Sequence, residues 1–137
     1  MTRRGLIFAA FAARLFADDS REVWELLGQV AGALSEGNLD EFLQAFDRSM
    51  ADYRTLELNV SSLLRQYEVR SSIEPLEEET KGLTHMVNLD WLLELVEQQD
   101  NTNITRRRER IHCEVMRQGK TWKVAKLEPI GFFAPPK

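Results

Sequence analysis

The stretch Gly82–Ile130 reads GLTHMVNLDWLLELVEQQDNTNITRRRERIHCEVMRQGKTWKVAKLEPI, and its pattern decides the fold. In Leu83–Glu97 nearly every odd-numbered residue is apolar, whereas Thr84, Asn88 and Asp90 take even positions. Alternation with a period of two is typical of a strand with one buried face. The pattern therefore predicts a long strand, although the apolar spacing of LDWLLELV also fits a helix.

Two further strands are predicted after this one, and all three are antiparallel neighbours. Apolar residues alternate with polar ones around Ile111 and Cys113, beyond a polar turn at Asp100–Asn103. Gly119 marks the next turn, because glycine adopts positive φ angles at little cost. A last β-like run begins at Trp122 and ends before Pro129.

Three helices are predicted ahead of this stretch. Asp18–Ser20 has the composition of a helix start, because serine caps helices and acidic residues are favourable near a helix N-terminus. An apolar stripe at helical spacing then reaches Leu34, and Gly37 ends the helix. Two more amphipathic runs follow, over Leu39–Arg48 and Asp52–Tyr67.

The segment Glu68–Glu78 predicts the first strand of the sheet. Pro75 either places this strand at an edge or breaks it, because proline cannot donate a hydrogen bond to a ladder. A charged turn, Glu77–Gly82, is expected after it, and the apolar tail Gly131–Lys137 is expected to finish the last strand or to lie over the open end of the core. The fold class is therefore α+β, with three N-terminal helices packed on a curved four-stranded antiparallel sheet.

Composition narrows the classes of function. The 137 residues suit one domain, and 43% hydrophobic with 29% charged residues is ordinary for a globular protein. A net charge of −4 argues against a nucleic-acid partner. Cys113 is the only cysteine, and the histidines are His85 and His112, so the sequence predicts no disulfide, no metal site and no cofactor.

Residues 1–17, MTRRGLIFAAFAARLFA, differ from the rest of the chain in charge. A basic start, an apolar run and small residues before Asp18 are the parts of a bacterial secretory signal peptide, with a loose likeness to a twin-arginine signal. The run is too short for a transmembrane helix and Arg14 interrupts it, so no stable membrane insertion is expected. The sequence predicts either an exported protein, periplasmic or secreted, or a cytoplasmic one in which the segment is an N-terminal helix; residues 18–137 form the domain.

From Ser20 to about Phe133 the chain resembles the nuclear transport factor 2-like superfamily, which includes ketosteroid isomerase-like and SnoaL-like proteins. Ala33–Phe42, ALSEGNLDEF, looks like the family's turn between its first two helices, and Gly119–Val124, GKTWKV, is similar to its Gly-x-Trp-x-Ile ending. The resemblance implies a cone-shaped, cystatin-like fold with an apolar pocket between sheet and helices and frequent dimerisation through the sheet. It implies no particular chemistry, because the same cone serves enzymes, binding modules and assembly domains.

Two residues are weak candidates for acid–base catalysis. His85 falls on the apolar face of its predicted strand, and histidine is the side chain that titrates nearest neutrality. Asp90 falls on the opposite face and is expected to be solvated unless a bulge re-aims it. His112 and Cys113 are neighbours on one strand, so they point to opposite faces and cannot form a dyad.

Arg106–Arg110 is the strongest charge run of the chain. Its even-numbered arginines share one face of the strand and are expected to form cross-strand ion pairs with Glu94 and Glu97. Arg107 takes the other face, where it could reach a pocket mouth and hold a ligand carboxylate. The full set of predicted pocket residues is Trp24, Tyr53, His85, Trp91, Arg107 and Trp122.

The sequence favours a domain that binds a small apolar ligand in this pocket, associates with itself as a homodimer, or does both. One alternative is an isomerase-like or hydrolase-like enzyme that uses His85 or Asp90 as acid or base. A further alternative is a protein–protein interaction module that uses the sheet face and the arginine-rich strand.

Overall fold

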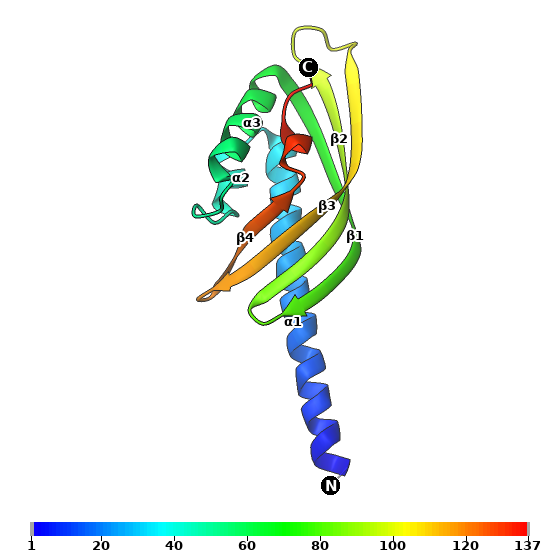
Figure 1. Cartoon of the computed structure of the whole chain (residues 1–137). Coiled ribbons are helices and arrows are strands. Elements are labelled where there is room, and N and C mark those ends of the chain that lie inside the picture. The colour runs from blue at the N-terminus through cyan, green and yellow to red at the C-terminus, as the bar shows by residue number, and fades with distance from the viewer. Residues whose placement is uncertain (1, 137) are drawn as a thin grey trace.

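Three helices precede a four-stranded sheet in the computed structural model, which describes the backbone of residues 2–136 and the side chains of residues 17–136 (Figure 1). The helices are α1 (Thr2–Glu36), α2 (Leu39–Gln44) and α3 (Tyr53–Gln66). The elements that follow are β1 (Tyr67–Lys81), β2 (Thr84–Glu97), β3 (Ile104–Gln118), β4 (Thr121–Glu128) and the 3₁₀ turn η1 (Ile130–Phe133). The strands pair antiparallel in chain order, which confirms the predicted α+β meander.

Strand β1 is an edge strand, as Pro75 predicts, and it is longer than expected. The predicted charged turn Glu77–Gly82 is wrong, because β1 continues beyond a bulge at Pro75–Glu77 and stays paired with β2 as far as Lys81. The reversal needs only two residues, since Gly82 takes the positive φ of 62° that most residues avoid. This extension brings the inward-facing side chains at the far end of β1 opposite His85.

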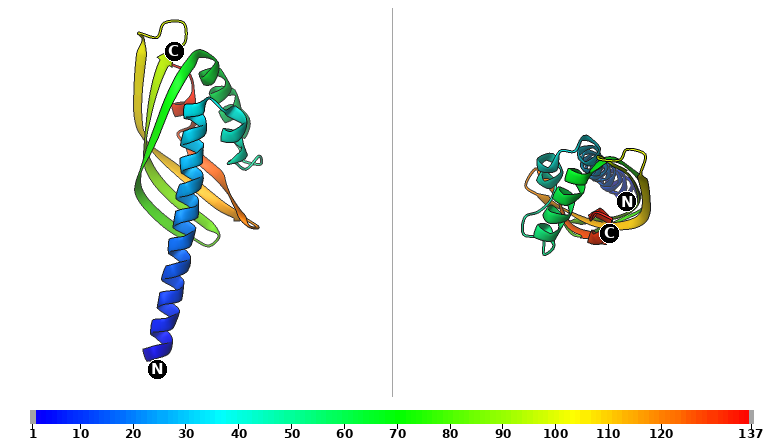
Figure 2. Two further views of the ribbon diagram at one scale, coloured as in Figure 1. Left: turned by 180° about the vertical axis from the view of Figure 1, so that it is seen from behind. Right: turned by 90° about the horizontal axis from the view of Figure 1, so that it is seen from above.

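The curved sheet wraps around α1, which runs along its concave face (Figure 2). The inward positions of β2 are buried along the whole strand, from His85 to Leu95, so the period-two reading of this stretch is confirmed. At the centre, the Trp91 and Phe133 rings meet edge to face with centroids 5.0 Å apart. The ring centroids of Phe42 and Phe133 are 6.3 Å apart. Aromatic side chains from α2, β2 and η1 therefore fill the space between sheet and helices.

Helix α1 begins at Thr2, so the predicted helix start at Asp18–Ser20 is wrong. No proline or glycine interrupts the chain between Gly5 and Gly28, and the alanine-rich sequence favours continuation of the helix. The N-terminal half of α1 projects beyond the sheet as a single rod (Figure 1). None of the described helices combines the length and the apolar character needed to cross a membrane.

Two connections near the C-terminal half of the fold also differ from expectation. Helix α2 ends at Gln44 and not at Arg48, because Phe46 forms a bridge with Val124 and the chain pairs with the edge of β4. The tail does not extend β4 but folds into η1 and lies over the core, with Phe133 buried.

We expect Phe133→Ala to destabilise the domain by about 3–5 kcal/mol, because it removes a fully buried ring that joins the tail to the core. Urea denaturation followed by circular dichroism measures this loss. Leu58→Ala is the matched control: Leu58 is 56% exposed on α3, and its removal should change stability by less than about 0.5 kcal/mol. Equal effects of the two substitutions would contradict this packing.

Candidate functional site

Polar side chains tie the middle of α1 to one end of the sheet. They come from α1 and from all four strands, and we call them the α1–sheet cluster. Its members are Asp19, Ser20, Glu22, Glu78, Thr80, His85, Arg117 and Trp122.

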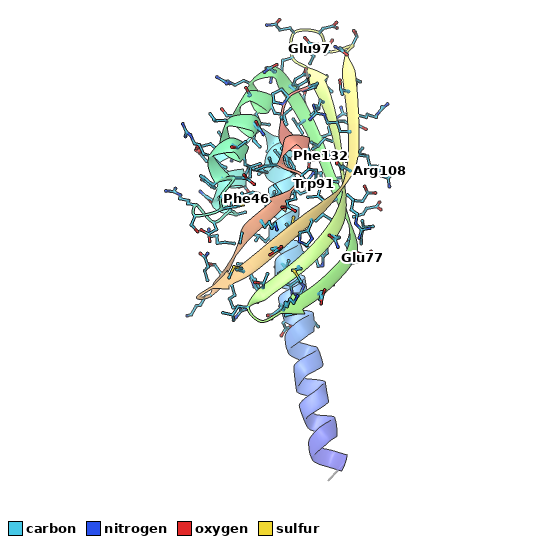
Figure 3. All side chains as sticks on the ribbon, in the orientation of Figure 1. Phe46, Glu77, Trp91, Glu97, Arg108 and Phe132 are labelled. Atoms are coloured by element: carbon cyan, nitrogen blue, oxygen red, sulfur yellow. The ribbon has the colours of Figure 1, made fainter. Side chains whose placement is uncertain are left out.

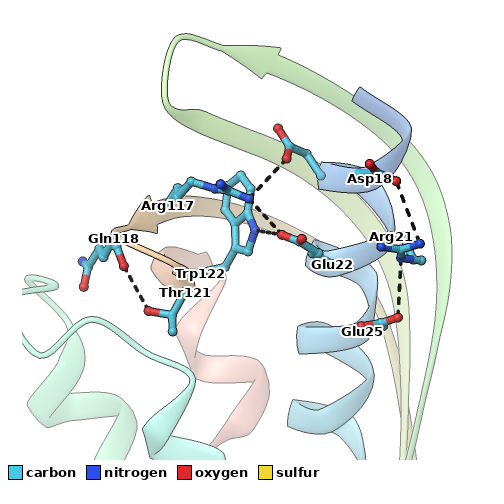
Figure 4. Close-up of polar contacts among 9 residues, drawn as sticks. Asp18, Arg21, Glu22, Glu25, Arg117, Gln118, Thr121 and Trp122 are labelled. Carbon is cyan, nitrogen blue, oxygen red and sulfur yellow. Dashed lines mark hydrogen bonds and ion pairs between the residues drawn. The ribbon is translucent and has the colours of Figure 1, made fainter. Parts of the chain in front are cut away.

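Glu22 of α1 is the centre of one half of this cluster (Figure 4). The indole Nε1–H of Trp122 donates to its carboxylate at 2.7 Å, and Arg117 reaches the same oxygen at 3.0 Å. The Arg117 guanidinium also lies 5.0 Å from the Trp122 ring centroid, within the range of a cation–π contact. The Trp122 indole is therefore held at its nitrogen and on its face.

His85 is the centre of the other half and is 1% exposed. Its Nε2 lies 2.7 Å from Glu78 Oε2, and its Nδ1 lies 3.2 Å from Thr80 Oγ1. The Ser20 hydroxyl of α1 donates to the Glu78 carboxylate at 2.8 Å. The Trp122 ring meets the imidazole edge to face, with centroids 6.3 Å apart, so the two halves of the cluster touch.

The pKa values of both glutamates lie below their ordinary range. The hydrogen bond from Trp122 is the main cause for the pKa of Glu22, and the charge of Arg117 acts in the same direction. Burial raises the pKa of Glu78, but the hydrogen bonds from His85 and Ser20 together outweigh it. Trp24 also acts to lower the pKa of Glu78. Both side chains are therefore carboxylates that accept several hydrogen bonds near neutral pH.

An open groove of about 1200 Å³ lies beside this cluster, between α1, α2 and the β3–β4 turn. Trp122 and Glu22 belong both to the groove and to the cluster. We call this depression the Trp122 groove. Its walls carry apolar, acidic and basic side chains, among them Leu26, Glu25, Asp40, Glu41, Lys120 and Lys123.

The six residues predicted to line one pocket do not converge. Trp24, His85 and Trp122 come together around the α1–sheet cluster. Trp91 is fully buried in the core, where its Nε1–H donates to Ser71 Oγ at 2.8 Å. Tyr53 lines a separate groove beside α2.

Arg107 lies at the tail of the chain and not at the Trp122 groove. Its guanidinium donates to the carbonyl oxygen of Phe132 at 2.9 Å and to that of Ala134. It also lines a shallow depression beside Pro129. In this structure Arg107 therefore fastens η1 to β3.

Asp90 lies on the outer face of the sheet, away from the helices, as the alternation predicts. It accepts a hydrogen bond from Arg108 Nε at 2.8 Å, which is the main cause of its lowered pKa. Arg106 pairs with Glu94 at 3.4 Å, and Arg110 pairs with Glu77. Figure 3 shows Arg108 and Glu77 pointing away from the core. The predicted cross-strand pairing of the arginines is confirmed, with Asp90 and Glu77 as partners beside Glu94 in place of the expected Glu97. Self-association through this face stays a prediction.

Neither the cysteine nor the carboxylates form a metal centre in the part of the chain described with side chains, where no three His, Cys, Asp or Glu side chains are grouped to hold an ion. Cys113 is fully buried, and burial raises the pKa of its thiol to about 12. It is a small core residue, on the face of β3 opposite to His112.

The sequence pattern missed the partners of His85. Glu78 and Thr80 fall in the predicted turn, and Ser20 in the predicted helix start. The signal that could have found them is the two-residue spacing of Glu78 and Thr80, which puts both on one face of a strand.

Comparison with known proteins identifies the fold. No protein-family model matches the sequence, and no curated protein matches it. A nuclear transport factor 2-like superfamily protein from Salmonella enterica has a similar structure, with a TM-score of 0.69 and 10% identity, over 82% of this chain and 89% of that one. A candidate scytalone dehydratase from Novosphingobium aromaticivorans gives a TM-score of 0.74 and 7% identity, over 84% and 85%.

A protein of unknown function from Mycobacterium tuberculosis is also similar, with a TM-score of 0.69 and 9% identity, over 84% of this chain and 72% of that one. The chain therefore has the nuclear transport factor 2-like fold, which confirms the resemblance seen in the sequence. Identities of this size show the fold alone, since proteins of one fold carry many functions.

We expect Glu22→Gln to lower the melting temperature by about 1–4 °C at pH 7, because it removes a partly exposed charge that pairs with Arg117. A carboxylate whose pKa is lowered by folding stabilises the protein above its unfolded pKa, here the ordinary value of 4.5, and loses this effect as the pH falls through the folded pKa. The difference between wild type and variant should therefore shrink below about pH 4.5. Differential scanning calorimetry from pH 7 to pH 3 measures it.

Glu25→Gln is the control for this series. Glu25 lies one turn along the same helix face, and among the described side chains its ion pair is with Arg21 at 3.8 Å. This substitution should change the melting temperature little at any pH. A difference for Glu22→Gln that stays constant down to pH 3 would contradict the role assigned to the Glu22 charge.

Proposed function

We propose that this chain is a ligand-binding domain that takes a small molecule with a flat apolar part in the Trp122 groove. The observation that carries the proposal is the fixed indole of Trp122 at the wall of this groove. Pockets for small molecules combine an apolar or aromatic surface with a few placed polar groups. The Trp122 groove offers both.

The rigidity of Trp122 supports this function. Its nitrogen is bonded to Glu22, and its ring is bounded by Arg117 and His85. An aromatic side chain that is already ordered loses little conformational freedom when a ligand packs against it. The exposed part of the indole is thus a preorganised surface.

The filled core favours a ligand site in the Trp122 groove and not in a deeper pocket. Trp91, Phe42 and Phe133 are all fully buried and in contact where the fold would otherwise enclose a cavity. A ligand between sheet and helices would have to displace these rings, whereas the Trp122 groove is open. The expected apolar pocket is therefore replaced in this proposal by a groove on the flank of α1.

The charges around the groove favour an amphipathic ligand. Lys120 and Lys123 lie on the side of the β3–β4 turn, and Asp40 and Glu41 lie on α2. A ligand whose flat part rests on Trp122 would meet a cation at one side and carboxylates at the other. An aromatic molecule with one charged substituent fits this arrangement.

The fluorescent aromatic sulfonate 1-anilinonaphthalene-8-sulfonate is a suitable probe, because it joins flat rings to one anionic group. We expect it to bind the folded protein, and we expect Trp122→Leu to weaken binding about tenfold, or about 1.4 kcal/mol, through loss of the flat contact. Fluorescence titration measures the affinity, and near-ultraviolet circular dichroism verifies that the variant keeps its tertiary structure.

Leu58→Ala is again the control, because Leu58 is exposed on α3 and lies outside the groove. It should bind the probe like the wild type. Equal affinities of wild type and Trp122→Leu would place the binding surface elsewhere and overturn the proposal.

The second candidate function is acid–base catalysis by His85. The observation that favours it is a buried imidazole bonded to a carboxylate, Glu78, which is how enzymes orient a general base. The observation against it is that both ring nitrogens already have partners, and Ser20 of α1 covers Glu78. A substrate would reach the imidazole only after α1 moved.

Assays with a β,γ-unsaturated ketone and with an epoxide separate the two functions. The binding proposal expects no turnover above the rate without protein. Turnover by the wild type that disappears in His85→Gln and persists in Asp90→Asn would establish the enzyme in place of the binding domain. Asp90 is a suitable control because it lies on the outer face of the sheet.

A further inference from the structure

The interior of helix α1 contains residues that are typical of a helix N-terminus. Its 35 residues make it about three times as long as an average helix. Asp18, Asp19 and Ser20 lie in its middle, although side chains of this kind are unfavourable inside helices and favourable at their N-termini. The first turn of α1, in contrast, has no acidic residue. The local preference of the sequence and the observed helix therefore disagree about where α1 begins.

The polar contacts between α1 and the sheet support a boundary at the same place. Asp19 pairs with Arg117 at 3.5 Å, Ser20 donates to Glu78 at 2.8 Å, and Glu22 accepts from Trp122. Among the described side chains of α1, Asp19 is the first that has a polar partner on the sheet. The part of the helix before this point extends away from the sheet (Figure 1). The fold thus holds α1 from Asp19 onward.

The composition changes at this boundary as well. Residues 1–17 contain three arginines and no acidic residue, whereas the rest of the chain has 15 basic and 22 acidic residues. Two arginines come first, a short apolar run follows, and Ala17 is the last residue before the acidic pair. A basic start, an apolar middle and a small residue before the cleavage site are features of a secretory signal peptide. Ala17 supplies the small residue, whereas Leu15 takes the other position that is usually small and Arg14 ends the apolar run.

From these three observations we propose that residues 1–17 are an export segment, and that the mature protein begins at Asp18. The step is the hydrolysis of the peptide bond between Ala17 and Asp18 by a signal peptidase. Water adds across this bond, which leaves a carboxylate on Ala17 and an α-amino group on Asp18. Cleavage precedes folding, because the same bond lies inside a helix in the full chain.

The proposal resolves the conflict within α1. A helix that begins at Asp18 has free N–H groups in its first turn, where Asp18, Asp19 and Ser20 supply acceptors and negative charge. The mature helix is then held at its new start by Arg117 and Glu78. The residues that are misplaced in a 35-residue helix are well placed in a 19-residue one that ends at Glu36.

The test is expression of the full chain in a Gram-negative bacterium, followed by separation of periplasm from cytoplasm and intact mass measurement of each fraction. We expect the periplasmic protein to have the mass of residues 18–137. Asp18→Pro should leave the chain uncleaved, because proline lacks the N–H and changes the geometry of the scissile amide. Asp18→Ala is the matched control and should be processed like the wild type.

A wild-type chain that stays in the cytoplasm with residues 1–17 attached would overturn the proposal, and so would cleavage at a bond other than Ala17–Asp18. Both results are independent of the Trp122 groove, which lies within residues 22–123. Processing without binding of the fluorescent probe, or binding without processing, would therefore separate the two proposals.

Discussion

The hydrogen bonds that α1 makes with the end of the sheet are the constraint on which the other features depend. Glu22 accepts from Trp122 and Arg117, and Ser20 donates to Glu78, which in turn bonds His85. One short segment of α1 is thereby connected to all four strands. These contacts hold the Trp122 ring beside the groove and bond α1 to the sheet from Asp19 onward. Glu22 and Glu78 each accept hydrogen bonds from more than one donor. Removal of either carboxylate would therefore leave these donors without that hydrogen bond.

The position of the candidate site follows from how the core is filled. A cone-shaped fold can enclose a cavity, but here Phe133 of the C-terminal turn meets Trp91 at the centre of the sheet. Arg107 keeps that turn in place through the carbonyl oxygens of Phe132 and Ala134. The tail therefore fills the space between sheet and helices, and an open groove lies on the flank, between α1 and the β3–β4 turn beside Trp122. Structures of the same fold share the outline of the sheet and helices, and the placement of a few large side chains decides where a ligand could lie.

The sheet could be predicted from the sequence because β2 is buried at every second position, from His85 to Leu95. This alternation determines which side chains of the strand face the core. The inward position of His85 and the outward position of Asp90 follow from the same alternation. The partners of His85 could not be predicted, since Glu78 and Thr80 lie in a run of charged residues that resembles a turn, and only pairing with β2 shows that it is a strand. The sequence pattern predicts one pocket that contains Tyr53, Arg107 and Trp122. The curvature of the sheet and the fold of the tail, which no local pattern encodes, place these residues in separate depressions. Capping chemistry predicts a helix start at Asp18–Ser20, but α1 continues through these residues because residues 6–27 contain neither proline nor glycine.

Hydrogen exchange of the tryptophan indole N–H groups, followed by nuclear magnetic resonance, tests the central claim that α1 is fixed to the sheet through Glu22 and Trp122. Trp91 is fully buried and bonded to Ser71, so its N–H provides the internal reference for strong protection. The N–H of Trp122 lies at a half-buried site, and only its bond to Glu22 would slow its exchange. The structure predicts clear protection of Trp122 relative to a free indole, although less than that of Trp91. Exchange of Trp122 at the rate of a free indole would contradict the fixed contact between α1 and the sheet.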